Sequence, residues 1–201
     1  MTQVFRYRSD EHLETIARMI ISQYDPCLLY RPTLIPVEKI MKSAYGLKIE
    51  YRHIKHKKGI LGETVFENAI IPLYNHAVGC CELQNVRAGT VFIDISLKHW
   101  RSYGRLRYTL AHELAHWVID KRCFKNINLN IKIVKNASSL ETDAAIERQA
   151  DRLASRILMP KGMVKSAFHD NKQNPINALA DLFGVSRQAM KIRLDELGLV
   201  E

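Results

Sequence analysis

Apolar residues recur at helical spacing along most of the chain, and this pattern predicts its helices. Between Asp10 and Tyr24 the apolar positions fall on one stripe, as expected for a helix that buries one face. These positions are Leu13, Ile16, Ala17, Ile20 and Ile21. The same spacing predicts further helices over residues 37–44, 108–119, 138–159, 161–169, 175–183 and 186–197. Pro26, Pro32 and Pro36 separate the first two helices and predict an irregular linker.

Strand-like runs, rich in β-branched and other apolar residues, lie between the second and third predicted helices. They cover Leu47–Tyr51, Thr64–Ile71, Ala77–Leu83 and Gly89–Ser96. Together with the helices, these runs predict an α+β fold.

The composition is that of an ordinary soluble globular protein. The chain has 201 residues, 47% hydrophobic and 25% charged, enough for one sizeable core or a core with a small appendage. No run is long and apolar enough to span a membrane, and the N-terminal residues lack the apolar core of a signal peptide. Cys27, Cys80, Cys81 and Cys123 show no C-x-x-C spacing. We therefore expect a reducing cytoplasm, with Cys80 and Cys81 as buried thiols.

The candidate chemistry is concentrated in the helix predicted over residues 108–119. His112 and His116 are four residues apart, so in a helix their side chains lie about 40° apart and can reach one small cation. Glu113 lies about 100° from His112, where it can accept a proton from a metal-bound water. This spacing is the H-E-x-x-H motif, which is typical of a zinc site with an open position.

A third metal ligand has to come from another element. Asp120 would lie about 12 Å along the helix from His112, too far to share one ion. The residues after His116 lack the Gly and third His of the metzincin pattern. In the next predicted helix Glu147 is a candidate, because it lies on a face of small residues that allows another helix to approach closely. Asp151, one turn on, would accept a hydrogen bond from the ring N–H of a ligand histidine.

Each assignment has a structural alternative. The motif helix could be a core helix whose histidines have protein partners, although burying two imidazoles and a carboxylate is costly unless they bind something. Glu147 could instead pair with a lysine or arginine at the surface. Glu141, three residues after Ser138, matches a capping box and would stabilise the start of its helix.

Two segments carry a resemblance to a known family. Residues 107–116, Arg-Tyr-Thr-Leu-Ala-His-Glu-Leu-Ala-His, and residues 147–160, which begin Glu-Arg-Gln-Ala-Asp, together resemble the ImmA/IrrE family of zinc metallo-endopeptidases. The Glu-x-x-x-Asp arrangement of the second segment is shared with gluzincins. The resemblance runs from about Pro36 to the C-terminus. Ala115 stands where the family usually has Gly, and Tyr108 where it usually has Phe; neither departure removes a reacting group.

The resemblance implies a zincin-like core over residues 36–160, with a small mixed or antiparallel sheet, the H-E-x-x-H helix and a ligand helix. Residues 1–35 would form an N-terminal helical extension and linker, and residues 161–201 a helix-turn-helix-like module of three helices. One Zn²⁺ per chain would be bound by His112, His116 and Glu147, with Glu113 as the catalytic acid/base. The strand Thr90–Ser96 would lie at the sheet edge over the zinc, where a substrate peptide could pair with it.

The activity implied by the resemblance is cleavage of a protein substrate, a DNA-binding transcriptional repressor of a mobile element or stress response. Zinc would polarise the scissile carbonyl, and Glu113 would pass the water proton to the leaving amine. Tyr103, Tyr108, His99 and His169 are open candidates for the further group that stabilises the oxyanion. The alternatives are a DNA-binding regulator with a structural or vestigial zinc site, against which the intact Glu113 argues, and an adaptor that binds a repressor without cutting it.

The net charge of +9 is concentrated partly in one predicted strand and turn. The basic residues there are Lys48, Arg52, His53, Lys55, His56, Lys57 and Lys58. Such a cluster could face nucleic acid. A solvated hairpin tip is the commoner outcome, and recognition of an acidic substrate is a third interpretation.

The last two predicted helices are joined by Phe183-Gly-Val-Ser186, which resembles the turn of a helix-turn-helix. Arg187, Gln188 and Lys191 would project from the second helix, as residues that contact DNA or a partner do. Three helices can also pack as a support. We favour a structural or substrate-docking role over DNA contact.

Overall fold

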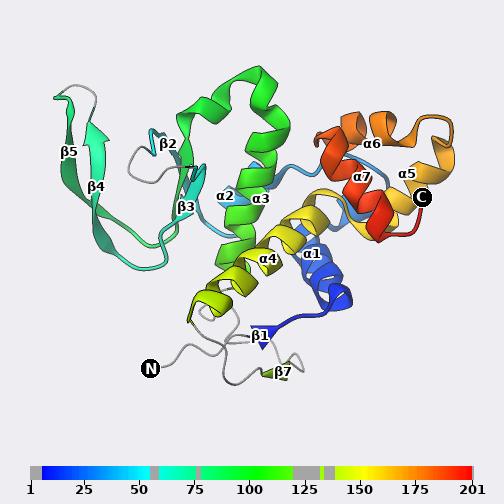
Figure 1. Ribbon diagram of the computed structural model, residues 1–201, viewed down its shortest axis with the longest axis horizontal. Coiled ribbons are helices and arrows are strands. Elements are labelled where there is room, and N and C mark those ends of the chain that lie inside the picture. The colour runs from blue at the N-terminus through cyan, green and yellow to red at the C-terminus, as the bar shows by residue number, and fades with distance from the viewer. Residues whose placement is uncertain (1–5, 55–58, 76–77, 120–131, 134–138, 201) are drawn as a thin grey trace.

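Two long helices, α3 (Tyr103–Ile119) and α4 (Ser139–Leu158), cross at the centre of the molecule (Figure 1). α1 (Asp10–Tyr24) packs against α4, and α2 (Val37–Ser43) packs against α3. The computed structural model describes residues 6–54, 59–75, 78–119, 132–133 and 139–200. Within them the fold is mixed α+β with small sheets, as predicted.

The helices form where the apolar spacing predicts them. All five residues of the predicted stripe on α1 are buried. In α4 the side chains of Ala150, Leu153, Ala154 and Ile157 are fully buried, and the two alanines let α3 approach closely. Short 3₁₀ helices, η1 (Pro26–Leu29), η2 (Ile95–Lys98) and η3 (Trp100–Ser102), lie in the connections.

A three-stranded mixed sheet lies beside α3. Its order is β2 (Lys48–Arg52), β6 (Thr90–Asp94) and β3 (Gly62–Thr64), with β2 parallel and β3 antiparallel to β6. The antiparallel strands β4 (Ala69–Asn75) and β5 (Cys80–Val86) extend away from the helices (Figure 1). β1 (Arg6–Tyr7) pairs with β7 (Lys132–Ile133).

Three predictions about the strands are wrong. Thr64–Ile71 is not one strand, because the chain leaves the three-stranded sheet after β3 and enters a different sheet at β4. The run Ala77–Leu83 corresponds to β5, which starts and ends three residues later. Thr90–Ser96 does not form a sheet edge, because β6 lies between β2 and β3. The edge strand that packs against α3 is β3.

The cysteines next to the tip of the β4–β5 pair also differ from expectation. Cys80 and Cys81 are exposed free thiols, not buried ones, and Cys27 is exposed too. The reason is that β5 belongs to a two-stranded sheet that extends away from the core, so an apolar run there does not become buried. Cys123 lies outside the described residues, as do Ser138 of the predicted capping box and Lys55, His56, Lys57 and Lys58 of the basic cluster.

Three helices follow α4, at the positions predicted. They are α5 (Lys161–Asp170), α6 (Pro175–Phe183) and α7 (Arg187–Glu196). Gly184 makes the turn between α6 and α7 with φ +62°, and the side chain of Ser186 caps α7 by accepting from the N–H of Ala189. Their buried side chains belong to the same core cluster as those of α1, α3 and α4.

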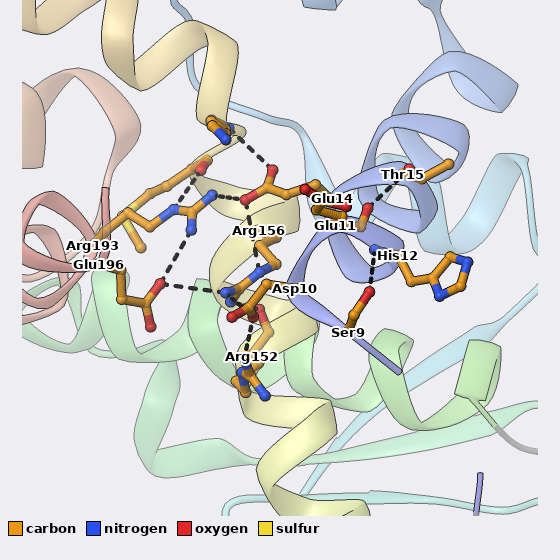
Figure 2. Close-up of polar contacts among 12 residues, drawn as sticks. Ser9, Asp10, Glu11, His12, Glu14, Thr15, Arg152, Arg156, Arg193 and Glu196 are labelled. Atoms are coloured by element: carbon orange, nitrogen blue, oxygen red, sulfur yellow. Dashed lines mark hydrogen bonds and ion pairs between the residues drawn. The ribbon is translucent and has the colours of Figure 1, made fainter. Parts of the chain in front are cut away.

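A network of ion pairs around two buried arginines ties α1, α4 and α7 together (Figure 2). Arg193 of α7, only 1% exposed, donates to the backbone carbonyl of Met159 at 3.1 Å and forms ion pairs with Glu196 at 3.1 Å and with Glu14 of α1. Arg156 of α4 donates to Asp10 of α1 at 2.6 Å. Both terminal helices are therefore fixed to α4. The division at residues 36 and 160 stays a prediction.

In the described part of the chain, no helix combines the length and the apolar character that crossing a membrane would need.

Candidate active site

Three potential metal ligands converge where α3 crosses α4. Nε2 of His112 and Nε2 of His116 lie 2.9 Å apart. The carboxylate of Glu147 lies 3.3 Å from His112 Nε2 and 3.4 Å from His116 Nε2. Ligands about 2 Å from a tetrahedral zinc lie roughly 3.3 Å from one another. The three side chains therefore fit one zinc-sized cation.

The local sequence explains why these residues meet. Helical spacing places both histidines on one face of α3, and the fully buried Ala150 and Ala154 keep α4 close to that face. Within the described residues, the ion pairs of Glu147 are with the two histidines, not with a lysine or arginine. The alternative prediction, in which Glu147 pairs with a lysine or arginine at the surface, is therefore not supported.

Asp151 lies one turn after Glu147 and contacts the far side of the His112 ring. Its Oδ1 lies 2.9 Å from His112 Nδ1 and accepts a hydrogen bond of 3.1 Å from the hydroxyl of Tyr108. A proton on Nδ1 leaves the lone pair of Nε2 directed toward the cluster. The hydrogen bond with His112 lowers the pKa of Asp151 despite partial burial, so its carboxylate stays charged.

The two histidines differ in their affinity for a proton. Burial alone would lower the pKa of His112, but the hydrogen bond to Asp151 and the charges of Glu113, Asp151 and Glu147 raise it overall. Burial and the neighbouring charge of His112 lower the pKa of His116. A neutral His116 beside a carboxylate is an available nitrogen ligand.

Glu113 is held apart from the ligand cluster. Its side chain is buried, 5% exposed, and its Oε2 accepts a hydrogen bond of 2.6 Å from the hydroxyl of Thr64 on β3. Burial raises its pKa to about 7, although the Thr64 hydrogen bond and the charge of His112 act in the other direction. The carboxyl is therefore in a dry environment where it can take up and release a proton near neutral pH.

Gly62, also on β3, leaves the space that Glu113 occupies. A Cβ at this position would lie 2.5 Å from Glu113 Oε1 and 2.8 Å from the methyl group of Thr109. Sequence reasoning missed both Gly62 and Thr64, because a three-residue strand carries no periodicity and no motif marks it. Only their nearness to Glu113 in the fold identifies them.

These groups face one open cavity of about 610 Å³. Its lining includes Gly62, Thr64, Tyr108, His112, Glu113 and Glu147. Of the four candidates for stabilising an oxyanion, Tyr108 lines this cavity. His99 instead accepts a backbone hydrogen bond at the start of η3, and Tyr103 is half exposed under the guanidinium of Arg107. His169 is an exposed residue of the last turn of α5.

The candidate DNA-contacting residues lie elsewhere. Arg187, Gln188 and Lys191 are exposed on α7, as predicted. In the described part of the basic cluster, Lys48 and Arg52 both pair with Glu50, at 2.6 and 2.9 Å. Their charges are thus partly neutralised, as in a solvated strand.

Comparison with solved structures supports the fold. A Mycobacterium tuberculosis transcriptional regulator matches over 92% of this chain, with a TM-score of 0.54 and 15% sequence identity. At this low identity the likeness shows the fold alone, and the chain spans only 46% of that structure's chain. A search of curated proteins found no match.

A match to a protein-family model covers the two helices that carry the potential metal ligands. The model of a peptidase family, described as the IrrE N-terminal-like domain, matches residues 91–195. The match is slightly more than half of the chain and includes His112, Glu113, His116, Glu147 and Asp151. The potential metal site and the three-stranded sheet are consistent with this zincin-like family. The chain therefore belongs to the IrrE N-terminal-like family of metallopeptidases.

Proposed function

We propose that this protein is a zinc-dependent endopeptidase that cleaves a peptide bond in a protein substrate. The observation that carries the proposal is the convergence of His112, His116 and Glu147 within one open cavity beside the buried carboxyl of Glu113. A structural metal site has no use for a proton-accepting carboxyl beside its ligands. Membership of a metallopeptidase family supports the same reaction class.

The proposed chemistry assigns a separate task to each residue. His112, His116 and Glu147 would hold the zinc, and Asp151 would orient His112 through Nδ1. A zinc ion held there would supply Lewis-acid activation of the attacking water and of the scissile carbonyl. Glu113 accepts the water proton at the carboxylate oxygen that Thr64 does not bind, and then delivers it to the leaving nitrogen. Tyr108 is the candidate donor to the developing oxyanion, because it lines the cavity; its O–H would have to turn from Asp151, to which it donates in this structure.

The substrate would bind as an extended peptide along β3. This strand lies at the edge of its sheet, contacts α3 and contributes Gly62 and Thr64 to the cavity. An edge strand offers backbone groups that can pair with a peptide. The resemblance to the ImmA/IrrE family favours a DNA-binding repressor as the protein that is cut. A cytoplasmic location is part of the proposal and is supported by the free thiols of Cys27, Cys80 and Cys81.

The test compares wild-type protein with Glu113→Gln on a candidate substrate, namely any transcription regulator found to be encoded near its gene. We expect the variant to bind zinc and fold as wild type does but to leave the regulator uncut, because only the proton acceptor is removed. Elemental analysis measures bound zinc, circular dichroism measures folding, and gel analysis measures cleavage of the regulator. Cleavage at an undiminished rate by Glu113→Gln would refute the proposed mechanism.

A second candidate function is DNA binding by α7. The exposed side chains of Arg187, Gln188 and Lys191 favour it, together with the net charge of +9. The double variant Arg187→Glu/Lys191→Glu would then lose operator binding while Glu113→Gln would retain the cellular phenotype. If Glu113→Gln behaves as a null allele, proteolysis is the function that matters in the cell.

A further inference from the structure

A second groove opens next to the catalytic cavity. It has a volume of about 520 Å³ and lies between α3, α4 and α7. Tyr108 and Asp151 line both this groove and the cavity that contains the potential metal ligands. The groove and the cavity are therefore adjacent, and they share the hydrogen-bonded pair of Tyr108 and Asp151.

The start of α7 forms one wall of this groove and is packed against α3. A Cβ at Gly104 of α3 would lie 3.4 Å from the backbone of Val185 and Ser186, so these two segments are in close contact. Arg107 of α3 also donates to the backbone carbonyls of Gly184 at 3.0 Å and Phe183 at 3.3 Å. DNA-recognition helices contact bases through their N-terminal residues. In this protein that end of the helix lies against the catalytic helix.

The wall formed by α7 is held rigidly. Arg193 is buried and bonds to Met159 at the end of α4, to Glu196 and to Glu14 of α1 (Figure 2). The α6–α7 turn is fixed independently by Arg107. Contacts at both ends of α7 thus fix its position relative to Tyr108 and Asp151, and a preformed wall lowers the entropy cost of binding a peptide.

The groove is mainly apolar, and charged side chains of both signs line its edge. Met159, Val185, Ala189 and Ile192 line it, and Ile192 is 52% exposed. At the rim, Arg105 is exposed. Both carboxylates of the lining have partners: Glu196 is paired with Arg193 at 3.1 Å and Arg156 at 3.5 Å, and Asp151 contacts His112 and Tyr108. A large apolar side chain with an acidic neighbour matches this surface.

We propose that this groove is a specificity subsite, which takes a large apolar side chain of the substrate within a few residues of the cleaved bond and favours an acidic residue beside it. The inference rests on the proposed endopeptidase function and adds a role for the C-terminal helices. In this role α7 contacts the substrate through Ile192, and Arg105 of α3 provides the charged contact.

The first experiment measures cleavage of a random dodecapeptide pool by zinc-loaded protein, with cut sites read by mass spectrometry. We expect Leu, Ile, Met or Phe to be enriched at one fixed position relative to the cut, with Asp or Glu enriched next to it. Ile192→Glu should abolish the apolar enrichment and lower kcat/KM for the preferred peptides about tenfold. Arg105→Glu should reverse the charge preference. Leu182→Glu, an exposed leucine of α6 outside the groove lining, is the matched control and should cut as wild type does.

The second experiment does not depend on turnover. Zinc-loaded Glu113→Gln protein is mixed with the same pool, and hydrogen exchange is measured over residues 103–108 and 186–192. We expect both segments to be protected, and protection to be lost in Glu113→Gln/Ile192→Glu.

The combined outcomes distinguish a failure of the subsite proposal from a failure of the endopeptidase proposal. Cleavage without an apolar preference, or equal behaviour of Ile192→Glu and Leu182→Glu, overturns the subsite and leaves the peptidase standing. Protection of both segments without any cleavage by wild type retains the groove as a peptide-binding surface and overturns the peptidase. If neither cleavage nor protection occurs, both proposals fail. Protection of residues 186–192 by random duplex DNA but not by peptides assigns α7 to nucleic acid instead.

Discussion

The hydroxyl of Thr64 donates a hydrogen bond of 2.6 Å to Oε2 of Glu113 and so joins the edge of the sheet to the motif helix. Glu113 is nearly buried, and a carboxyl group in such a place needs a partner to hold one orientation. Thr64 is therefore expected to fix which carboxylate oxygen faces the cavity.

Replacing Thr64 tests this relationship. Thr64→Val keeps the shape of the side chain but removes the donor, and we expect kcat/KM for a cleaved peptide to fall about tenfold or more because the carboxyl loses its orientation. Thr64→Ser retains a hydroxyl and should stay close to wild type. Zinc content should be unchanged in both. Equal activities of the Val and Ser variants would show that the hydrogen bond has no part in catalysis.

Gly62 should tolerate no side chain. In Gly62→Ala the new Cβ would lie 2.5 Å from Glu113 Oε1, so Glu113 has to move, and a misplacement of about 1 Å costs on the order of 100-fold in rate. Gly162→Ala, near the start of α5, is the control, because a Cβ there has nothing within 4 Å, and alanine should leave α5 at least as stable. Peptide cleavage and thermal melting compare the two. An active Gly62→Ala enzyme would contradict the assigned position of Glu113.

The helices could be predicted because amphipathic spacing is a local signal. The five buried residues of α1 are those of the predicted stripe. The ligand triad could be proposed because His112 and His116 are one turn apart and the small residues of α4 favour close helix packing. Their roles as ligands stay a proposal until a metal is measured.

The missing parts of the site depend on pairing between distant segments. β3 pairs with β6, about thirty residues later, and no local pattern marks Gly62 or Thr64 as neighbours of Glu113. The exposed Cys80 and Cys81 were mispredicted for a related reason. An apolar run is buried only if something packs on it, and β4 and β5 form a sheet of their own.

The ligand set predicts how the protein binds metal. Purified protein should hold about one zinc per chain, since two histidines and a glutamate provide three of the four positions of a tetrahedral site. Glu147→Gln should weaken binding by removing ligand charge, and Asp151→Asn should weaken it roughly 10- to 100-fold by disturbing His112. Glu11→Gln, at an exposed position of α1, is the control. Elemental analysis and chelator competition measure the affinities. Full occupancy in Glu147→Gln would move the third ligand elsewhere.

Asp94 should make stability depend on acid pH. Its carboxylate accepts the N–H of Ile54 at 2.9 Å and of Ser96 at 3.0 Å. Burial raises its pKa, but these hydrogen bonds lower it more, to below the ordinary value of 3.8. A lowered folded-state pKa means that the stabilisation is present above the unfolded value and is lost as pH falls through the folded one.

The matching variant is Asp94→Asn. It should be less stable than wild type at pH 7 by about 1 kcal/mol, because the amide keeps one acceptor oxygen but loses the other and the charge. The difference should shrink as pH is lowered below about 4, where wild type loses the same charge. Urea unfolding at several pH values measures the difference in the free energy of unfolding between the variant and wild type. A difference that stays constant down to pH 2 would contradict the assigned role of the Asp94 charge.

Arg193 should be the most costly charged residue to remove outside the active site. It is buried, and it bridges Glu14 of α1 and Glu196 of α7 while bonding to Met159. In Arg193→Met both carboxylates lose this partner, and breaking a buried pair in this way costs about 3–5 kcal/mol. Lys42→Met is the control, because its ion pair with Glu38 is half exposed, and such pairs contribute less than about 1 kcal/mol. Urea unfolding gives both values, and similar losses for the two variants would refute the structural importance of the network. Because α7 forms a wall of the groove, Arg193→Met protein that is still folded should also lose peptide protection at residues 186–192.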